Sequence, residues 1–279
     1  MTFIKRALTT IIGLPAVAFV IIIGGWPLYV VVCLAAMLGL FELNKAFAMP
    51  LALQAVGFAF TVINFVAVYF LDGVFWEGLL LYIIALATLT VIHYGKFSLD
   101  AVIKAAFGFL YVPFMLTFVL LVRDATDYGH INVWIIFIAC FGCDTFAYLI
   151  GSAFGKRKLV NSPSPSKTVA GLVGGVAGAG ILGFLILFFV SRMDFFFVSD
   201  AMLSLTFDAA MLGAVFVMVG AVFSIIGDMF GSALKRHTGI KDFGNLFPGH
   251  GGMMDRLDSI VIVAPFVFIV LHSLERMFG

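Results

Sequence analysis

Long apolar runs recur along the whole sequence, separated by short polar connections. A helix that crosses a bilayer needs about 20 mostly apolar residues. By that measure the pattern predicts about nine transmembrane helices, which lie at Ala7–Ile23, Pro27–Phe41, Leu53–Leu71, Gly78–His93, Ile103–Val122, Ile131–Ile150, Gly171–Ser191, Ala209–Gly227 and Leu257–His272. Lipid cannot satisfy open backbone groups, so helices are expected. We therefore predict an all-α, polytopic integral membrane protein, with residues 1–279 forming a single membrane domain.

The composition supports this class and excludes others. Hydrophobic residues make up 63% of the chain and charged residues 11%, whereas a soluble domain is about 25% charged. The three cysteines, Cys33, Cys140 and Cys143, are an odd number within apolar runs, so a secreted disulfide framework is excluded. The sequence has no basic arm and no zinc-finger spacing, so nucleic acid is not an expected partner. Membrane lipid is an expected partner.

Lysine and arginine residues predict the orientation. With the N-terminus in the cytoplasm and nine spans, all sixteen lie on the cytoplasmic side except Arg123, Arg192 and Arg276. This is the positive-inside bias of membrane proteins. The two long polar loops, 151–168 and 228–256, fall on the same side. We therefore predict a multi-pass protein of the cell (inner) membrane whose active site faces the cytoplasm.

Four carboxylates flank these loops. Asp144 lies within the sixth span, Asp228 ends the eighth, and Asp255 and Asp258 share one helical face at the start of the ninth. A charge inside the membrane costs at least about 2.5 kcal/mol, so such residues usually have a function. For Asp144, a packing role with a neighbouring Thr or Tyr is the alternative. Clustered carboxylates share protons or bind a cation, and oxygen ligands favour Mg²⁺.

Basic residues are interleaved with these acids. Phosphates that are bridged by Mg²⁺ and clamped by Lys and Arg would account for both sets. The alternative is that the basic residues contact anionic lipid headgroups. That alternative does not explain the acids or the glycine-rich turn Pro248–Gly252, where backbone N–H groups can approach a phosphate. His250 fits either a base or phosphate donor, or a structural loop histidine.

A second glycine pattern lies in the seventh span. Gly171 and Gly175 form one GxxxG spacing, and Gly174 and Gly178 form another. Small residues at this spacing let two membrane helices approach closely. We expect close helix packing here, and a homodimer is one arrangement that would use it.

The second long loop carries a longer motif, whose four segments are Ser232–Arg236, Lys241–Gly244, Phe247–Gly252 and Asp255–Asp258. At every spacing they resemble the signature of the phosphatidate cytidylyltransferases, also called CDP-diglyceride synthetases. The segments Cys143–Tyr148, Gly155–Leu159 and Ser164–Thr168 resemble the family more loosely. The chain departs from the family pattern at three positions. Ser166 replaces a usual Lys, while Ala170 and Gly231 replace usual or frequent Glu residues.

The resemblance implies transfer of a cytidylyl group from CTP to phosphatidate, with Mg²⁺ as cofactor and CDP-diacylglycerol and pyrophosphate as products. The catalytic elements would then lie in 142–170 and 227–259. The metal ligands would be Asp144, Asp228, Asp255 and Asp258. The catalytic residues would be Lys235, Arg236, Lys241, Asp242, His250 and Arg256, and the binding residues Lys167, Ser232, Gly249, Gly251 and Gly252.

Two other functions are weighed against this one. A CTP-dependent membrane lipid-alcohol kinase would move the terminal phosphate and release CDP. A transporter of phosphorylated lipid would use the acids as a cation or proton site. Transporters are often built from internal repeats, and the sequence shows no repeat.

Overall fold

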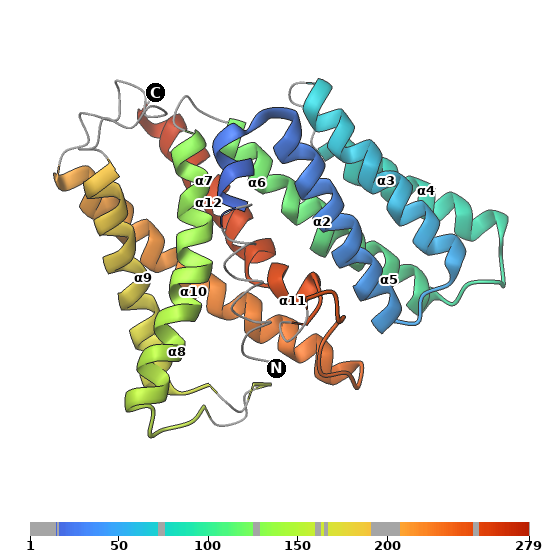
Figure 1. Ribbon diagram of the computed structural model, residues 1–279. Coiled ribbons are helices and arrows are strands. Elements are labelled where there is room, and N and C mark those ends of the chain that lie inside the picture. The colour runs from blue at the N-terminus through green and yellow to red at the C-terminus, as the bar shows by residue number, and fades with distance from the viewer. Residues whose placement is uncertain are drawn as a thin grey trace. The chain divides into compact units, whose positions relative to one another are not determined.

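The computed structural model describes residues 15, 17–71, 76–124, 129–159, 163–164, 167–190, 207–247 and 251–278 (Figure 1). Most of these residues are helical. The helices are α2 (Gly25–Ala46), α3 (Leu51–Phe70), α4 (Trp76–Ile92), α5 (Leu99–Phe109), η1 (Leu110–Phe114), α6 (Met115–Asp124), α7 (Gly129–Phe137), η2 (Ile138–Gly142), α8 (Cys143–Phe154), α9 (Val169–Val190), α10 (Phe207–His237), α11 (Met254–Leu257) and α12 (Ile260–Phe278). Within the described ranges the β-structure consists of two isolated bridges, Lys158–Thr168 and Phe247–Gly251. The all-α prediction is confirmed.

The described residues include seven helical segments that are long and apolar enough to cross a membrane, and α4 is a shorter apolar helix of 17 residues. The chain is therefore a multi-pass membrane protein. The predicted count of about nine spans is not confirmed. Most of the first predicted span, Ala7–Ile23, lies outside the described residues.

Two of the spans contain a π-helical turn. The span Leu99–Asp124 contains η1, which includes Pro113, and the span Gly129–Phe154 contains η2. Proline cannot donate the backbone hydrogen bond of a regular α-helix, and a π-turn accommodates the break. The second π-turn ends directly before Cys143, so it sets the helical face on which α8 carries Asp144.

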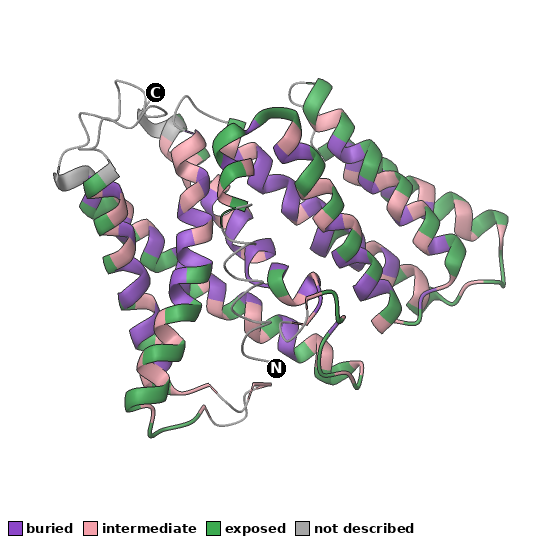
Figure 2. Cartoon of the chain, viewed as in Figure 1, coloured by how far each residue is buried: buried purple, intermediate pink, exposed green. Residues whose placement is uncertain are grey.

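The chain divides into two compact units. The first contains residues 1–120 and 235–257, and α2, α3, α4 and α5 pack together within it. Two buried polar side chains donate hydrogen bonds there: the Asn64 amide donates to Thr117 Oγ1 at 2.9 Å, and the Tyr82 hydroxyl donates to the Ala105 carbonyl at 3.0 Å. Figure 2 shows buried residues alternating with exposed ones along α2 and α3. The single membrane domain stays a prediction.

The second unit contains residues 121–234 and 258–279. The glycines of α9 pack against α8: a Cβ added to Gly175 would lie 2.9 Å from the Cys143 carbonyl oxygen, and one added to Gly171 would lie 2.9 Å from the Ala147 oxygen. On its other side α9 meets α10, where a Cβ on Gly183 would lie 2.8 Å from Val217. The predicted close helix packing is confirmed, and it occurs within one chain.

Candidate active site

The first unit contains a buried ion pair. Lys235 lies in the last turn of α10 and Asp255 in the first turn of α11. Lys235 Nζ lies 2.7 Å from Asp255 Oδ1, and the two side chains are 11% and 5% exposed. The ammonium also lies 5.4 Å from the centre of the Phe243 ring, within the range of a cation–π contact. The pair therefore ties the end of α10 to the start of α11.

The other oxygen of Asp255 organises the loop between these helices. Oδ2 accepts hydrogen bonds from the backbone N–H groups of Phe243 and Gly252, both at 2.9 Å. Gly252 precedes Asp255 by three residues, the spacing at which an acidic residue in a first helical turn reaches back to the chain before it. Gly251 has a φ of +80°, and a Cβ there would lie 2.7 Å from Oδ2, so glycine is required.

A second carboxylate in the same unit binds the same loop. Glu42 Oε1 accepts the N–H of Met253 at 3.0 Å, and Oε2 accepts that of Met254 at 2.8 Å. These N–H groups are at the start of α11, where no carbonyl of the helix can reach them. Glu42 thus connects α2 to a loop more than 200 residues away in the sequence.

The second unit contains another lysine–aspartate pair. Lys167 Nζ forms a salt bridge with Asp228 of α10, and the side chains are 20% and 29% exposed. Lys167 is held by a short antiparallel pairing, in which Leu159 N donates to the Lys167 carbonyl at 3.1 Å. Directly after it, the Thr168 hydroxyl accepts the Gly171 N–H at 3.1 Å and caps α9. The loop that carries Lys167 is therefore fixed at the start of α9.

Asp144 and Asp258 also belong to the second unit. Cys143 lies within electrostatic range of Asp144, Lys167 and Asp228, and Cys140 lies within range of Asp144 and Asp258. Asp258 is buried against α10: a Cβ on Gly231 would lie 2.8 Å from the Asp258 Cβ. In this chain the close approach leaves no room for a side chain at position 231. Three of the four predicted metal carboxylates thus belong to one unit.

Comparison with known proteins identifies the family. The model of the cytidylyltransferase family matches residues 4–274. The chain belongs to the cytidylyltransferase family.

Curated relatives within this family carry one name. The phosphatidate cytidylyltransferase of Bacillus subtilis is 29% identical over 274 residues, 96% of this chain and 97% of its own length. The protein of that name from Staphylococcus saprophyticus is 30% identical over 271 residues, 95% and 98% of the two chains. The one from Thermotoga maritima is 37% identical over 166 residues, 60% of this chain and 57% of its own. The resemblance predicted from the loop motifs is confirmed.

The remaining residues predicted for this cytidylyltransferase site lie at different depths. Ser232 is buried on α10, and Gly252 is buried before α11. Four of the predicted residues are exposed: Arg236, Lys241, Asp242 and Arg256. Gly249 and His250 lie outside the described residues. The predicted roles of all these residues stay predictions.

Mg²⁺ remains a prediction for this cytidylyltransferase. Among the described residues no group of three or more His, Cys, Asp or Glu side chains forms a metal-binding cluster. Mg²⁺ is usually bound by one or two carboxylates, and water and substrate phosphates complete its coordination. Asp228 in the second unit and Asp255 in the first are each paired with a lysine ammonium, so each carboxylate lies beside a positive charge.

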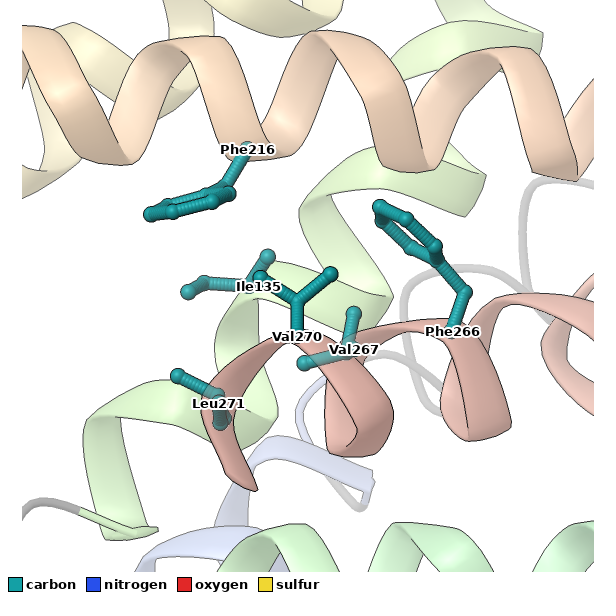
Figure 3. A pocket seen from close by; sticks show the side chains of 6 residues that line it. All are labelled: Ile135, Phe216, Phe266, Val267, Val270 and Leu271. Atoms are coloured by element: carbon teal, nitrogen blue, oxygen red, sulfur yellow. The ribbon is translucent and has the colours of Figure 1, made fainter. Parts of the chain in front are cut away.

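A small hollow in the second unit does not fit a nucleotide. It has a volume of about 10 Å³, and six apolar side chains line it: Ile135, Phe216, Phe266, Val267, Val270 and Leu271 (Figure 3). A water molecule needs about that much room and two to four polar partners. The polar residues described above, and not this hollow, are the candidates for binding phosphate.

Glu42 is the residue of this site that the sequence argument missed. Glu42 lies one residue beyond the predicted second span, Pro27–Phe41, so it was not counted as a carboxylate within the membrane. Glu42 is followed by Lys45, and this pair at the end of an apolar run reads as the start of a polar connection. The sequence does not show that the partner of Glu42 is the backbone of residues 253 and 254.

Proposed function

We propose that this protein transfers the cytidylyl group of CTP to phosphatidate, giving CDP-diacylglycerol and pyrophosphate. The observation that carries the proposal is the family match across residues 4–274, together with relatives named phosphatidate cytidylyltransferase that align over almost their whole length. The segments that resemble the family's signature form the Lys235–Asp255 pair and its loop. Both substrates carry phosphate groups, which suits the lysines and arginines of these loops.

The reaction needs little acid–base chemistry from the protein. The phosphate monoester of phosphatidate is ionised at neutral pH, so its oxygen can attack the α-phosphorus of CTP directly. A new P–O bond forms, the bond between the α-phosphorus and the bridging oxygen breaks, and pyrophosphate leaves with that electron pair. The work of the protein is then to position the two phosphates and to offset their charge.

We assign this work to the residues that the sequence predicted. The side chains proposed to hold phosphates are those of Lys167, Lys235, Arg236, Lys241 and Arg256. Ser232, Asp242, His250 and the turn Gly249–Gly252 are proposed to shape the pocket. Asp144, Asp228, Asp255 and Asp258 are the proposed ligands of Mg²⁺, which would neutralise phosphate charge when bound.

We also propose that the protein lies in the cell (inner) membrane with this site facing the cytoplasm. Contacts within the first unit fit the prediction that these segments share one side of the membrane. The contact of Glu42 with Met253 and Met254 joins the Lys45 end of α2 to the second loop, and both are on the predicted cytoplasmic side. Lys104, predicted on that side too, lies 6.0 Å from the Phe47 ring.

The orientation can be tested by labelling introduced cysteines. In a variant without the three natural cysteines, a cysteine at Lys96 should react with a membrane-impermeant reagent from the cytoplasmic side. A cysteine near Gly279 should react from the opposite side. A C-terminal cysteine that reacts from the cytoplasmic side alone would contradict the nine-span orientation.

A homodimer stays a prediction, and the glycine pattern that suggested it has another explanation. The glycines of α9 that suggested it are covered within the same chain. Gly171 and Gly175 pack on α8, and so do Gly174 and Gly178. They therefore do not offer a free surface to a second copy.

The function is tested with purified protein in detergent, phosphatidate, Mg²⁺ and CTP labelled at the α-phosphate. Cytidylyl transfer places the label in the lipid. A lipid-alcohol kinase would leave the label in CDP and move the terminal phosphate to a lipid alcohol. A transporter would leave CTP intact.

A further inference from the structure

The first unit contains a buried carboxylate to which the proposed reaction gives no role. Glu42 is 8% exposed and lies in α2, an apolar helix whose one other charged residue is Lys45. Burial of a carboxylate is unfavourable unless hydrogen bonds replace the water that it loses. Its position therefore depends on the groups that bind it.

Those groups are backbone N–H groups at the end of the second long loop, directly before and at the start of α11. Each carboxylate oxygen of Glu42 accepts one of them, from Met253 and from Met254. Hydrogen bonds to an ionised acceptor are shorter and stronger than those between neutral groups. These two hydrogen bonds fix the position and the orientation of the backbone where α11 begins.

Two glycines let the loop close around this carboxylate. A Cβ on Gly252 would lie in contact with both oxygens of Glu42, and a Cβ on Gly244 would overlap Oε1. These residues are eight positions apart in the loop, so the backbone passes the carboxylate twice. Any side chain at either position would push the loop away from α2.

The neighbouring carboxylate completes the arrangement. Asp255 accepts the N–H of Gly252, and Glu42 accepts the next two, from Met253 and Met254. Three consecutive N–H groups are therefore held by two carboxylates, one from α2 and one from α11 itself. Lys241 lies earlier in the same loop, and Arg256 is the third residue of α11.

We infer that Glu42 is a positioning residue, which fixes the backbone at the start of α11 so that the neighbouring phosphate-binding groups meet CTP. The inference rests on the proposed function for what these groups bind. Glu42 acts through the backbone N–H groups of Met253 and Met254, and no contact with the substrate is proposed for it. A substitution of Glu42 should therefore change the positions of Lys241 and Arg256 without changing their charge.

The structural half of the inference is tested by hydrogen–deuterium exchange, which needs no activity. Glu42→Gln keeps the size of the side chain but turns an NH2 group towards a backbone N–H. Exchange at residues 253–254 should become about tenfold faster or more, because hydrogen bonds to a charged acceptor are lost. Exchange in α3 should not change. Glu77→Gln, an exposed residue of α4 in the same unit, is the matched control and should alter neither region.

The functional half is tested by steady-state kinetics. Glu42→Gln should raise the apparent KM for CTP about tenfold, in line with the cost of a misplaced binding group. A variant that merely unfolds in part would lower kcat and leave KM unchanged. Gly244→Ala should raise the KM as well, because its methyl group displaces the loop. A double variant combines Gly244→Ala with Glu42→Asp, whose shorter side chain leaves room for the added methyl group. The fold-increase in KM of this double variant should be smaller than the product of the fold-increases of the two single variants.

Exchange and kinetics together decide the inference. Faster exchange at residues 253–254 together with a raised KM for CTP supports it. Unchanged exchange overturns it, and so does faster exchange with wild-type kinetics. If Glu42→Gln does not fold, Gly244→Ala gives the same comparison from the loop side. A wild-type protein that makes no CDP-diacylglycerol would refute the proposed function, and exchange at residues 253–254 would still decide whether Glu42 fixes the loop.

Discussion

The two lysine–aspartate pairs, one in each compact unit, are built differently. In the first unit, Asp255 accepts hydrogen bonds from Lys235 and from two backbone N–H groups, and its side chain is 5% exposed. In the second unit, Asp228 pairs with Lys167, and its side chain is 29% exposed. Both aspartates are proposed Mg²⁺ ligands. Asp255 also holds a loop in shape, whereas Asp228 holds a lysine that water can reach.

This difference in burial predicts different consequences when either aspartate is removed. Removing one partner of a buried pair leaves the other charge without compensation, which costs about 3–5 kcal/mol. A pair that is open to solvent contributes about 1 kcal/mol or less. Substitutions in the two pairs should therefore affect stability and catalysis in different proportions.

The largest effect is expected for Asp255→Asn. It removes a proposed metal ligand, leaves Lys235 uncompensated, and weakens the bonds to Phe243 and Gly252. Cytidylyl transfer should fall at least about 100-fold, the scale of losing a strong electrostatic group in a site. The assay is transfer of α-labelled CTP into lipid at saturating Mg²⁺. Near-normal turnover would show that Asp255 has neither role.

Asp228→Asn should mainly change the requirement for metal. The Mg²⁺ concentration that gives half-maximal transfer should rise about 10- to 100-fold, the usual scale for residues that support a bound metal. Lys167 would lose its partner but could still reach water, so the protein should fold. A Mg²⁺ titration of the variant beside the wild type measures the shift. An unchanged midpoint would remove Asp228 from the metal ligands.

Lys167→Ala tests the loop in which Ser166 departs from the family pattern. With no Lys at position 166, Lys167 is the nearest donor for the nucleotide phosphates in this loop. A hydrogen bond to a charged group contributes about 1.5–3 kcal/mol, so the apparent affinity for CTP should fall about 10- to 100-fold. Ser166→Lys should raise it or leave it unchanged. If the CTP dependence of Lys167→Ala matches the wild type, this loop does not contact the nucleotide.

The smallest effect is expected at a third pair, which extends the comparison to the surface. Lys104 Nζ lies 2.6 Å from Asp100 Oδ2 on α5, with side chains 34% and 71% exposed. Asp100→Asn should change the free energy of unfolding by about 0.5 kcal/mol or less, as for other exposed helix pairs. Thermal unfolding in detergent provides the measurement. A loss of unfolding free energy as large as that of Asp255→Asn would mean that burial does not determine how much each pair contributes to stability.

The sequence predicted much of the fold because the dominant signal is local. Apolar runs mark the spans, and the ends of α3 and α9 lie within two residues of the predicted ends. The predicted second span, Pro27–Phe41, is too short: the apolar run stops before Glu42, whereas α2 continues to Ala46. Hydropathy does not show that Glu42 belongs to the helix, because its hydrogen-bond partners are backbone groups far away in the sequence.

The candidate site was less predictable because its contacts are not local. Repulsion among the four acids was the basis of the metal prediction, yet Asp228 and Asp255 are each paired with a lysine. The pairing of Lys235 with Asp255 across 20 residues depends on how the loop folds back, which spacing alone does not give. The glycines of α9 were a better guide, because GxxxG spacing directly implies close packing.

The most direct test of the difference between the two pairs is thermal unfolding of the purified protein without Mg²⁺ or CTP. Under these conditions ligand binding cannot contribute, so the Tm reports the roles of the aspartates in the fold. Asp255→Asn should lower the Tm by about 6 °C or more, and Asp228→Asn by less than about 3 °C, from the expected costs of the two losses. Equal shifts, or a larger shift for Asp228→Asn, would contradict the account.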